Sequence, residues 1–193
     1  MLYAIGKISI FVVNCRSMKG IIMQSQLISV KYNDKTWFDL LRKHGGDILV
    51  SDNFKMTRYH MQHGTMPVSS HCINVARMSV LIALKFGIRC DMRSLVRGAL
   101  LHDYFLYDWH DNDHHQIFRL HGFFHPGIAL QNAAMEYDLS WIERDIIKKH
   151  MWPLTIILPL CKETWIVVIA DKYCSLLETL RIYKGYSEKK RAA

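Results

Sequence analysis

The sequence lacks the cysteine pattern of a disulfide-bonded or zinc-knuckle protein. Its 193 residues include five cysteines, at positions 15, 72, 90, 161 and 174, and no two of them are spaced as CxxC. A secreted disulfide framework uses an even number of cysteines, and a zinc knuckle uses close pairs. These absences favour reduced, mostly buried cysteines, as is usual for a protein of the cytosol.

The sequence also lacks an apolar run of the roughly 20 residues that a membrane-spanning helix needs. The apolar stretch 8–13 is short, and no small-residue cleavage site of a signal peptide clearly follows it. We therefore interpret residues 1–22 as an N-terminal extension, with Met18 and Met23 as alternative starts. We predict a cytoplasmic protein that binds no membrane, and a secreted protein is the alternative.

Basic residues interleaved with aromatic ones, which would indicate a nucleic-acid interface, are missing as well. The net charge is +8, but part of it lies in Lys189-Lys190-Arg191, within a basic tail of residues 186–193. The remaining positive charge weakly favours a small phosphate-bearing substrate. We expect no stable binding of nucleic acid.

No segment shows the period-two alternation that predicts a half-buried strand. Apolar residues recur at helical spacing instead, and Asp91 and the capping box Ser140 to Glu143 mark helix starts. Ser69 or Ser70 could cap another helix, and Gly87 is predicted to end it. We expect one all-α domain of about six or more helices over residues 23–185. The predicted helices are 35–43, 70–86, 92–106, 126–137, 141–150 and 162–183, with 55–62 as a further candidate.

The adjacent pair His102-Asp103 indicates where the chemistry lies. Leu95 and Ala99 precede His102 at the spacing of one helix face, and apolar residues precede Asp103 in the same way. A carboxylate in such a buried position costs several kcal/mol unless a partner satisfies it. A divalent cation would be such a partner.

Other predicted helices carry histidines and an aspartate at or near apolar faces. Nitrogen and oxygen ligands suit first-row transition metals rather than a calcium or pure magnesium cage. Six ligands are too many for one catalytic ion, but they suffice for two ions that share a bridging carboxylate, for which Asp103 is the candidate. We predict two divalent ions, iron or manganese first and zinc, cobalt or nickel as alternatives. The candidate ligands are His71, His102, Asp103, His125, His150 and Asp171, and His114, His115 or His121 could replace His125.

The order His, His-Asp, His, His, Asp on predicted helices resembles that of the HD-domain superfamily of metal-dependent phosphohydrolases, in its binuclear six-ligand form. The resemblance covers about residues 60–182. It rests on QHG at 62–64, RGALLHDYFLYDWH at 97–110, LHGFFHP at 120–126, KKHMWP at 148–153 and ADKY at 170–173. It implies an HD-domain helical bundle with these six metal ligands. It also implies hydrolysis of a phosphate ester or anhydride, such as that of a nucleotide, by a hydroxide that bridges the two metals. His102 and Asp103 are then the catalytic residues.

The sequence departs from the family pattern at two positions. Leu106 stands where many binuclear members have a lysine that contacts phosphate. Met151-Trp152-Pro153 follows His150 in place of the Gly-Tyr-Pro signature of cyclic-dinucleotide phosphodiesterases. We therefore do not expect hydrolysis of cyclic-di-GMP.

Two histidines and two lysines are candidates for substrate contacts, although loop packing and solvated surface would explain them equally well. These candidates are His63, His121, Lys149 and Lys172. The ligand set leaves two alternatives open. One is an HD-fold di-iron oxygenase, which uses an equivalent ligand set, and the other is a non-catalytic nucleotide-sensing module. The sequence leaves the oligomeric state open.

Overall fold

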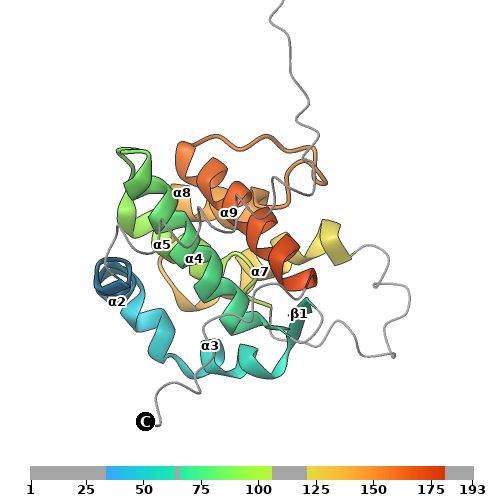
Figure 1. Cartoon of the computed structure of the whole chain (residues 1–193). Coiled ribbons are helices and arrows are strands. Elements are labelled where there is room, and N and C mark those ends of the chain that lie inside the picture. The colour runs from blue at the N-terminus through green and yellow to red at the C-terminus, as the bar shows by residue number, and fades with distance from the viewer. Residues whose placement is uncertain (1–33, 64–65, 106–120, 181–193) are drawn as a thin grey trace, which may run out of the picture. The chain divides into compact units, whose positions relative to one another are not determined.

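The structure is a computed structural model that describes residues 34–63, 66–105 and 121–180. All of these residues except Asp34 belong to one compact unit, Lys35–Ala193. The described part is all-α, as predicted, apart from one small hairpin (Figure 1). Its helices are α2 (Asp34–Val50), α3 (Asp52–Met56), α4 (Val68–Lys85), α5 (Met92–Leu101), α7 (His121–Glu136), α8 (Trp141–Lys149) and α9 (Lys162–Thr179).

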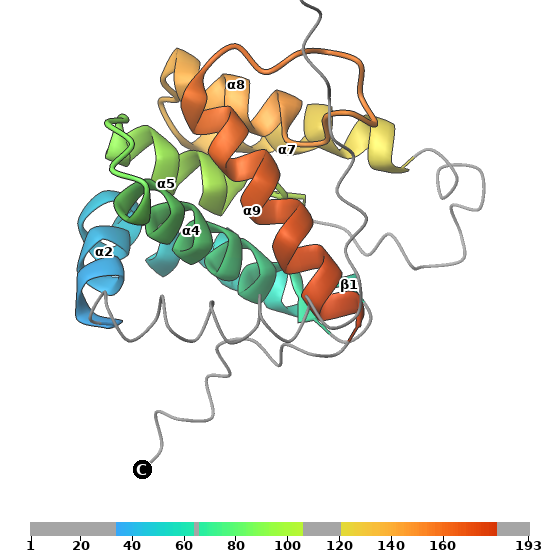
Figure 2. The same cartoon turned by 45° about the horizontal axis from the view of Figure 1, so that its top comes forward.

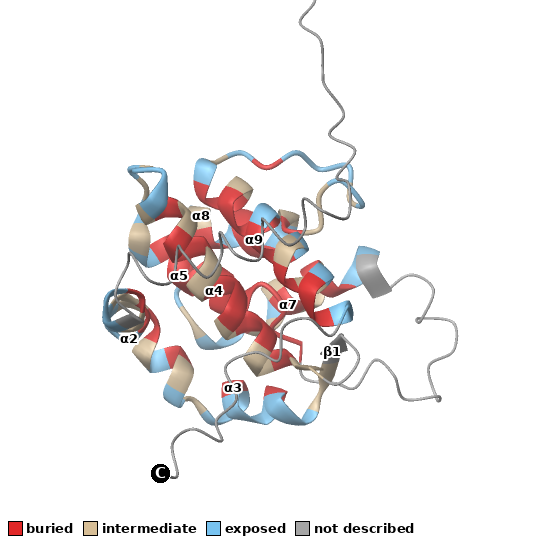
Figure 3. Ribbon diagram, in the orientation of Figure 1, coloured by how far each residue is buried: buried red, intermediate tan, exposed pale blue. Residues whose placement is uncertain are grey.

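The helices α4, α5, α8 and α9 form the core that positions the site. Helix α4 packs against α5 and α9, α5 also packs against α8, and α8 packs against α7 and α9. Figure 2 shows α9 crossing α4, and Figure 3 shows buried residues along the faces where these helices meet. Val75, Leu100, Ile146 and Val167, one from each of the four helices, are fully buried. The apolar stripes read from the sequence therefore face one another.

Two glycines allow α5 to lie close to its neighbours. A Cβ on Gly98 would lie 2.5 Å from Cδ1 of Ile146 on α8, and a Cβ on Gly45 would overlap Cδ1 of Leu100. Helix α2 continues through Gly45 to Val50, so the prediction that it ends near this glycine was wrong. The glycine serves close packing against α5 and does not terminate the helix.

The candidate helix 55–62 is helical only as far as residue 59, and a small hairpin follows that the sequence did not indicate. Helix α3 ends at Met56, a 3₁₀ turn covers Thr57–Tyr59, and β1 (Met61–His63) pairs antiparallel with β2 (Met66–Pro67). Strands of three and two residues are too short to show an alternating pattern. The backbone N–H of Val68 donates to the His60 carbonyl at 2.9 Å, which joins the hairpin to the start of α4.

Several predicted helix ends are confirmed. Asp91 caps α5 by accepting from the Ser94 N–H, both hydrogen bonds of the Ser140–Glu143 capping box are present, and Gly87 follows α4 with a φ of 61°. Two starts differ from the prediction. Helix α4 begins at Val68, with Pro67 rather than Ser69 or Ser70 at the N-cap position and no side-chain capping bond, and α7 begins at His121, which leaves Pro126 inside it.

Some predictions fall on residues outside the described part. These are the N-terminal extension 1–22, the alternative ligands His114 and His115, the tail 186–193, and residues 107–120 of a loop predicted over 107–122, whose last two residues instead begin α7. Within the part that the structure describes, no helix combines the length and the apolar character needed to span a membrane.

Candidate metal centre

The structure brings the six predicted ligands together in the interior of the helical unit. All six side chains are buried. They come from five helices that are far apart in the sequence but packed side by side: His71 on α4, His102 and Asp103 directly after α5, His125 on α7, His150 directly after α8, and Asp171 on α9.

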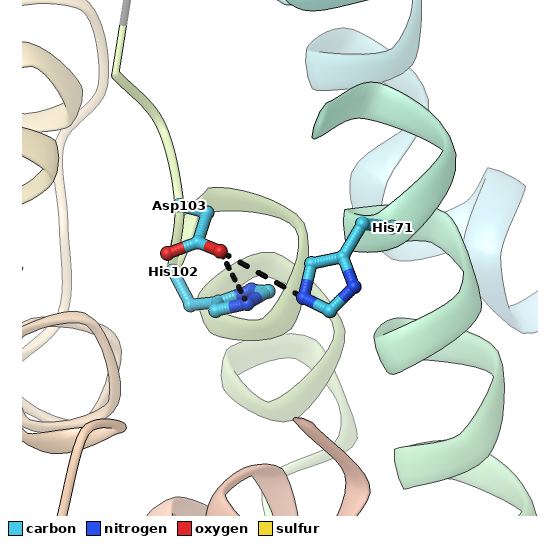
Figure 4. A group of neighbouring side chains, drawn as sticks. All are labelled: His71, His102 and Asp103. Carbon is cyan, nitrogen blue, oxygen red and sulfur yellow. Dashed lines mark ion pairs between the residues drawn. The ribbon is translucent and has the colours of Figure 1, made fainter. Parts of the chain in front are cut away.

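One group of ligand atoms surrounds Oδ2 of Asp103. This oxygen lies 3.3 Å from Nε2 of His102 and 3.7 Å from Nε2 of His71 (Figure 4). Oδ1 of Asp171 completes the group, at 3.2 Å from Nε2 of His71 and 3.8 Å from Nε2 of His102. Each of the two imidazoles therefore lies close to both carboxylates.

A second group surrounds the other oxygen of the same carboxylate. Oδ1 of Asp103 lies 3.1 Å from Nε2 of His125 and 3.3 Å from Nε2 of His150. The two Nε2 atoms are themselves only 2.8 Å apart. The spacing of His71, His102 and Asp103, and that of Asp103, His125 and His150, is suitable for a metal ion. Asp171 lies beside the first set, whereas Asp103 belongs to both. It thus lies where a bridging carboxylate would have to lie.

Hydrogen bonds on the far side of the rings determine which nitrogen faces the centre. Nδ1 of His102 lies 2.8 Å from the Ala99 carbonyl, and Nδ1 of His150 lies 2.9 Å from the Ile147 carbonyl. A carbonyl oxygen only accepts, so Nδ1 carries the proton and Nε2 of the neutral ring presents a lone pair. This is the orientation that metal-binding histidines adopt.

The charges of the group are strongly coupled. Burial would lower the pKa of His71, but hydrogen bonds to Asp171 and Glu178 outweigh it and raise that pKa to about 10. Burial lowers the pKa of His150 to about 4 although Asp103 opposes this. Burial would raise the pKa of Asp103 and of Asp171, yet the adjacent histidines hold both well below the usual range. Both carboxylates are therefore ionised at neutral pH.

This arrangement fits a metal centre by the chemistry of its donors. Nε2 of His102 is fully buried and makes no hydrogen bond within the described part of the chain, although two carboxylates lie nearby. In the neutral ring this lone pair faces the carboxylate of Asp103, so one acceptor faces another. Such a contact is unfavourable in a buried site unless a proton on Nε2 or a metal cation lies between the two groups. Burial would lower the pKa of His102, but Asp103 outweighs it and raises that pKa well above 6.5, so positive charge is favoured at this position.

Comparison with known families identifies the fold. The family model of the HD domain matches residues 68–176, more than half of the chain and all six clustered residues. The chain belongs to the HD-domain family. Comparison with curated proteins gives no match, and neither does comparison with solved structures.

The HD domain holds its predicted substrate-contact residues in different settings. Nζ of Lys172 lies 2.8 Å from Oδ2 of Asp171 at the centre, and its side chain is 43% exposed. Lys149 instead forms an ion pair with Asp145 and is mostly buried. His63 lies in β1 and His121 is the first residue of α7, but their side chains are outside the described part.

One residue of the HD domain that contacts a predicted ligand was missed from the sequence. Oε2 of Glu178 lies 2.8 Å from Nδ1 of His71, and its Oε1 accepts from the Asn74 amide at 3.1 Å. The signal was present, because Glu178 follows Asp171 by seven residues and therefore lies on the same face of α9. Its contact with α4, more than 100 residues away in the chain, could not be read from spacing.

Proposed function

We propose that this HD-domain protein is a metal-dependent phosphohydrolase that acts on a phosphate ester or anhydride of a small molecule, such as a nucleotide, in the cytoplasm. The observation that carries the proposal is the division of five buried candidate ligands into two groups that share the two oxygens of Asp103, with Asp171 beside the first group. A shared carboxylate of this kind is what a pair of metal ions requires.

The two groups would hold the ions in unequal ways. His71, His102, Asp171 and Oδ2 of Asp103 supply four ligand atoms, whereas His125, His150 and Oδ1 of the same aspartate supply three. When bound, two divalent ions supply an activated water near neutral pH and bind the oxygens of a phosphoryl group. The three-ligand group would leave more positions open for water and substrate.

Charge supports an anionic substrate. Two divalent cations would bring four positive charges, and the carboxylates of Asp103 and Asp171 supply two negative ones. The net charge of about +2 would favour a hydroxide together with a phosphate oxygen.

Lys172 is the described side chain best placed to assist with the phosphate. Its ammonium group lies beside Asp171 and 3.4 Å from the carbonyl of His150, so it touches a residue from each group. The departure at Leu106 removes the lysine that many binuclear HD proteins have after the His-Asp pair. We propose that Lys172 takes that role, whereas Lys149 is held by Asp145 and serves packing.

The proposal is tested by phosphate release from a panel of nucleotides and sugar phosphates. The protein is assayed with Mn²⁺, Fe²⁺, Co²⁺ or Ni²⁺ and, separately, with a chelator. We expect metal-dependent turnover that His102→Ala and Asp103→Ala abolish. His44→Ala is the matched control, because His44 lies on α2 outside the ligand groups.

Turnover that survives in both site variants would reject the assignment. Oxygen uptake without phosphate release would support the di-iron oxygenase alternative instead. Tight nucleotide binding without turnover would support the sensing module.

A further inference from the structure

We infer that Glu178, held in place by Asn74, is a positioning residue that sets the metal affinity of the His71 group and leaves the His125–His150 group unaffected. The inference rests on the proposed metal centre and adds a residue to it. Glu178 has a fully buried side chain, and Asn74 is 2% exposed. Neither residue belongs to the two groups that could hold an ion.

The contacts of Glu178 connect α9 to the back of the His71 ring. A carboxylate oxygen is only an acceptor, so at 2.8 Å from Oε2 of Glu178 the Nδ1 atom of His71 carries a proton. Oδ1 of Asp171, 3.2 Å from Nε2, favours a second proton on that atom, which a bound metal ion would displace. The lone pair of a neutral His71 is then on Nε2, the atom that faces Asp171 and Asp103. Carboxylates in this position orient a ligating imidazole and raise its basicity.

The other two rings whose far-side contact is described are held differently. His102 and His150 donate to the carbonyls of Ala99 and Ile147, each three residues earlier in the same segment. Those contacts are made by the backbone, so no side-chain substitution removes them. The His71 ring, in contrast, depends on a side chain from another helix. Its ligand geometry can therefore be changed without touching the ligands themselves.

Asn74 accounts for how Glu178 keeps its orientation. Asn74 follows His71 by three residues on α4, and its Nδ2 donates to Oε1 of Glu178 at 3.1 Å. One oxygen of the carboxylate is thus held by Asn74 while the other accepts from His71. A buried carboxylate with both oxygens engaged has little freedom to turn away from the ring.

The experiment measures binding of Mn²⁺ alone to the full chain, by equilibrium dialysis and elemental analysis. We expect wild type to bind two equivalents. Glu178→Leu should weaken one equivalent by about tenfold to a hundredfold, the usual effect of losing such a partner, and leave the other unchanged. Glu178→Gln keeps a neutral acceptor, since the Asn74 amide can turn over to receive its NH₂ group, and should weaken the same equivalent only a few-fold.

A double variant shows whether Glu178 acts through His71. Adding Glu178→Leu to His71→Ala should cause no further loss of Mn²⁺ affinity, because the ring that Glu178 orients is already gone. Glu163→Leu is the matched control. Glu163 is also buried on α9, but its Oε1 accepts from the Asp91 N–H, away from the centre. It should leave both equivalents unchanged.

The inference is overturned if Glu178→Leu weakens both equivalents alike, weakens neither, or adds to the effect of His71→Ala. If Glu178→Leu does not fold, Glu178→Gln decides. Unchanged Mn²⁺ affinity at both equivalents, or an equal loss of affinity at both, would then overturn the inference. Absence of any Mn²⁺ binding by wild type would instead overturn the proposed function together with this inference.

Discussion

The contact between Gly98 on α5 and Ile146 on α8 links helix packing to the geometry of the metal centre. Each residue lies four positions before a ligand, His102 in one case and His150 in the other. A Cβ at position 98 would lie 2.5 Å from Cδ1 of Ile146 and 2.9 Å from its Cβ and Cγ2. A β-branched side chain on a helix has one favoured rotamer, so Ile146 cannot swing aside. We therefore expect Gly98→Ala to push the two helices apart.

The change in the free energy of unfolding caused by Gly98→Ala follows from two opposing effects. Overpacking of a core costs about 1–3 kcal/mol, and the higher helix propensity of alanine over glycine returns about 0.5–1 kcal/mol. The free energy of unfolding should fall by up to about 2.5 kcal/mol, which lowers Tm by up to about 10 °C for a domain of this size. Mn²⁺ affinity should fall as well, because the rings of His102 and His150, now 4.9 Å apart between centroids, would separate.

Urea unfolding of the metal-free protein measures the first effect, and Mn²⁺ titration measures the second. Gly46→Ala is the control, because a Cβ there meets nothing within 4 Å and should stabilise α2. Ile146→Ala removes the atoms that clash most, so the double variant with Gly98→Ala should be more stable than the sum of the single effects. A Gly98→Ala protein as stable as Gly46→Ala, with unchanged Mn²⁺ affinity, would refute the reasoning.

Three further outcomes are expected. Mn²⁺ at a hundred times its Kd should stabilise each occupied site by about 2.7 kcal/mol, so a chelator should lower Tm in a thermal melt, and Asp103→Ala should abolish the difference. Burial would raise the pKa of Asp145, but its partners Lys149 and Thr164 outweigh this and lower the pKa from 3.8. The stability that it contributes is therefore present above pH 3.8 and lost as the pH falls through the lowered pKa, so Asp145→Asn should destabilise less at pH 2 than at pH 7 in urea unfolding. Steady-state kinetics on an identified substrate should show a higher KM for Lys172→Ala, with kcat less affected; an unchanged KM would exclude the phosphate contact.

The six clustered residues could be predicted because a buried polar residue interrupts an apolar helical face, and such interruptions are visible in the sequence. His102 ends one stripe and His71 begins another, so both were expected in the interior. The helix starts at Asp91 and Ser140 were also readable, because their capping contacts span only three residues. Local chemistry therefore gave the order of the helices and the composition of the centre.

Contacts between distant helices could not be predicted in the same way. From the sequence Gly45 was taken as a helix end, because its close approach to Leu100 on another helix cannot be seen there. The partner of Glu178 is likewise on another helix. The division of the ligands into two groups is a property of how α4, α5, α7, α8 and α9 pack. No spacing along the chain records which oxygen of Asp103 faces which histidines.

Helices α5 and α8 both end at the candidate metal centre, with His102 and His150 as their C-cap residues. The C-terminus of a helix carries a partial charge of about −0.5, so the peptide dipoles add roughly one negative charge beside the two carboxylates. The backbone itself thus attracts cations to this position. Because each ring is held by a carbonyl in its own last turn, inserting one residue into that turn would rotate the ring by roughly 100° and remove a ligand without altering any side chain.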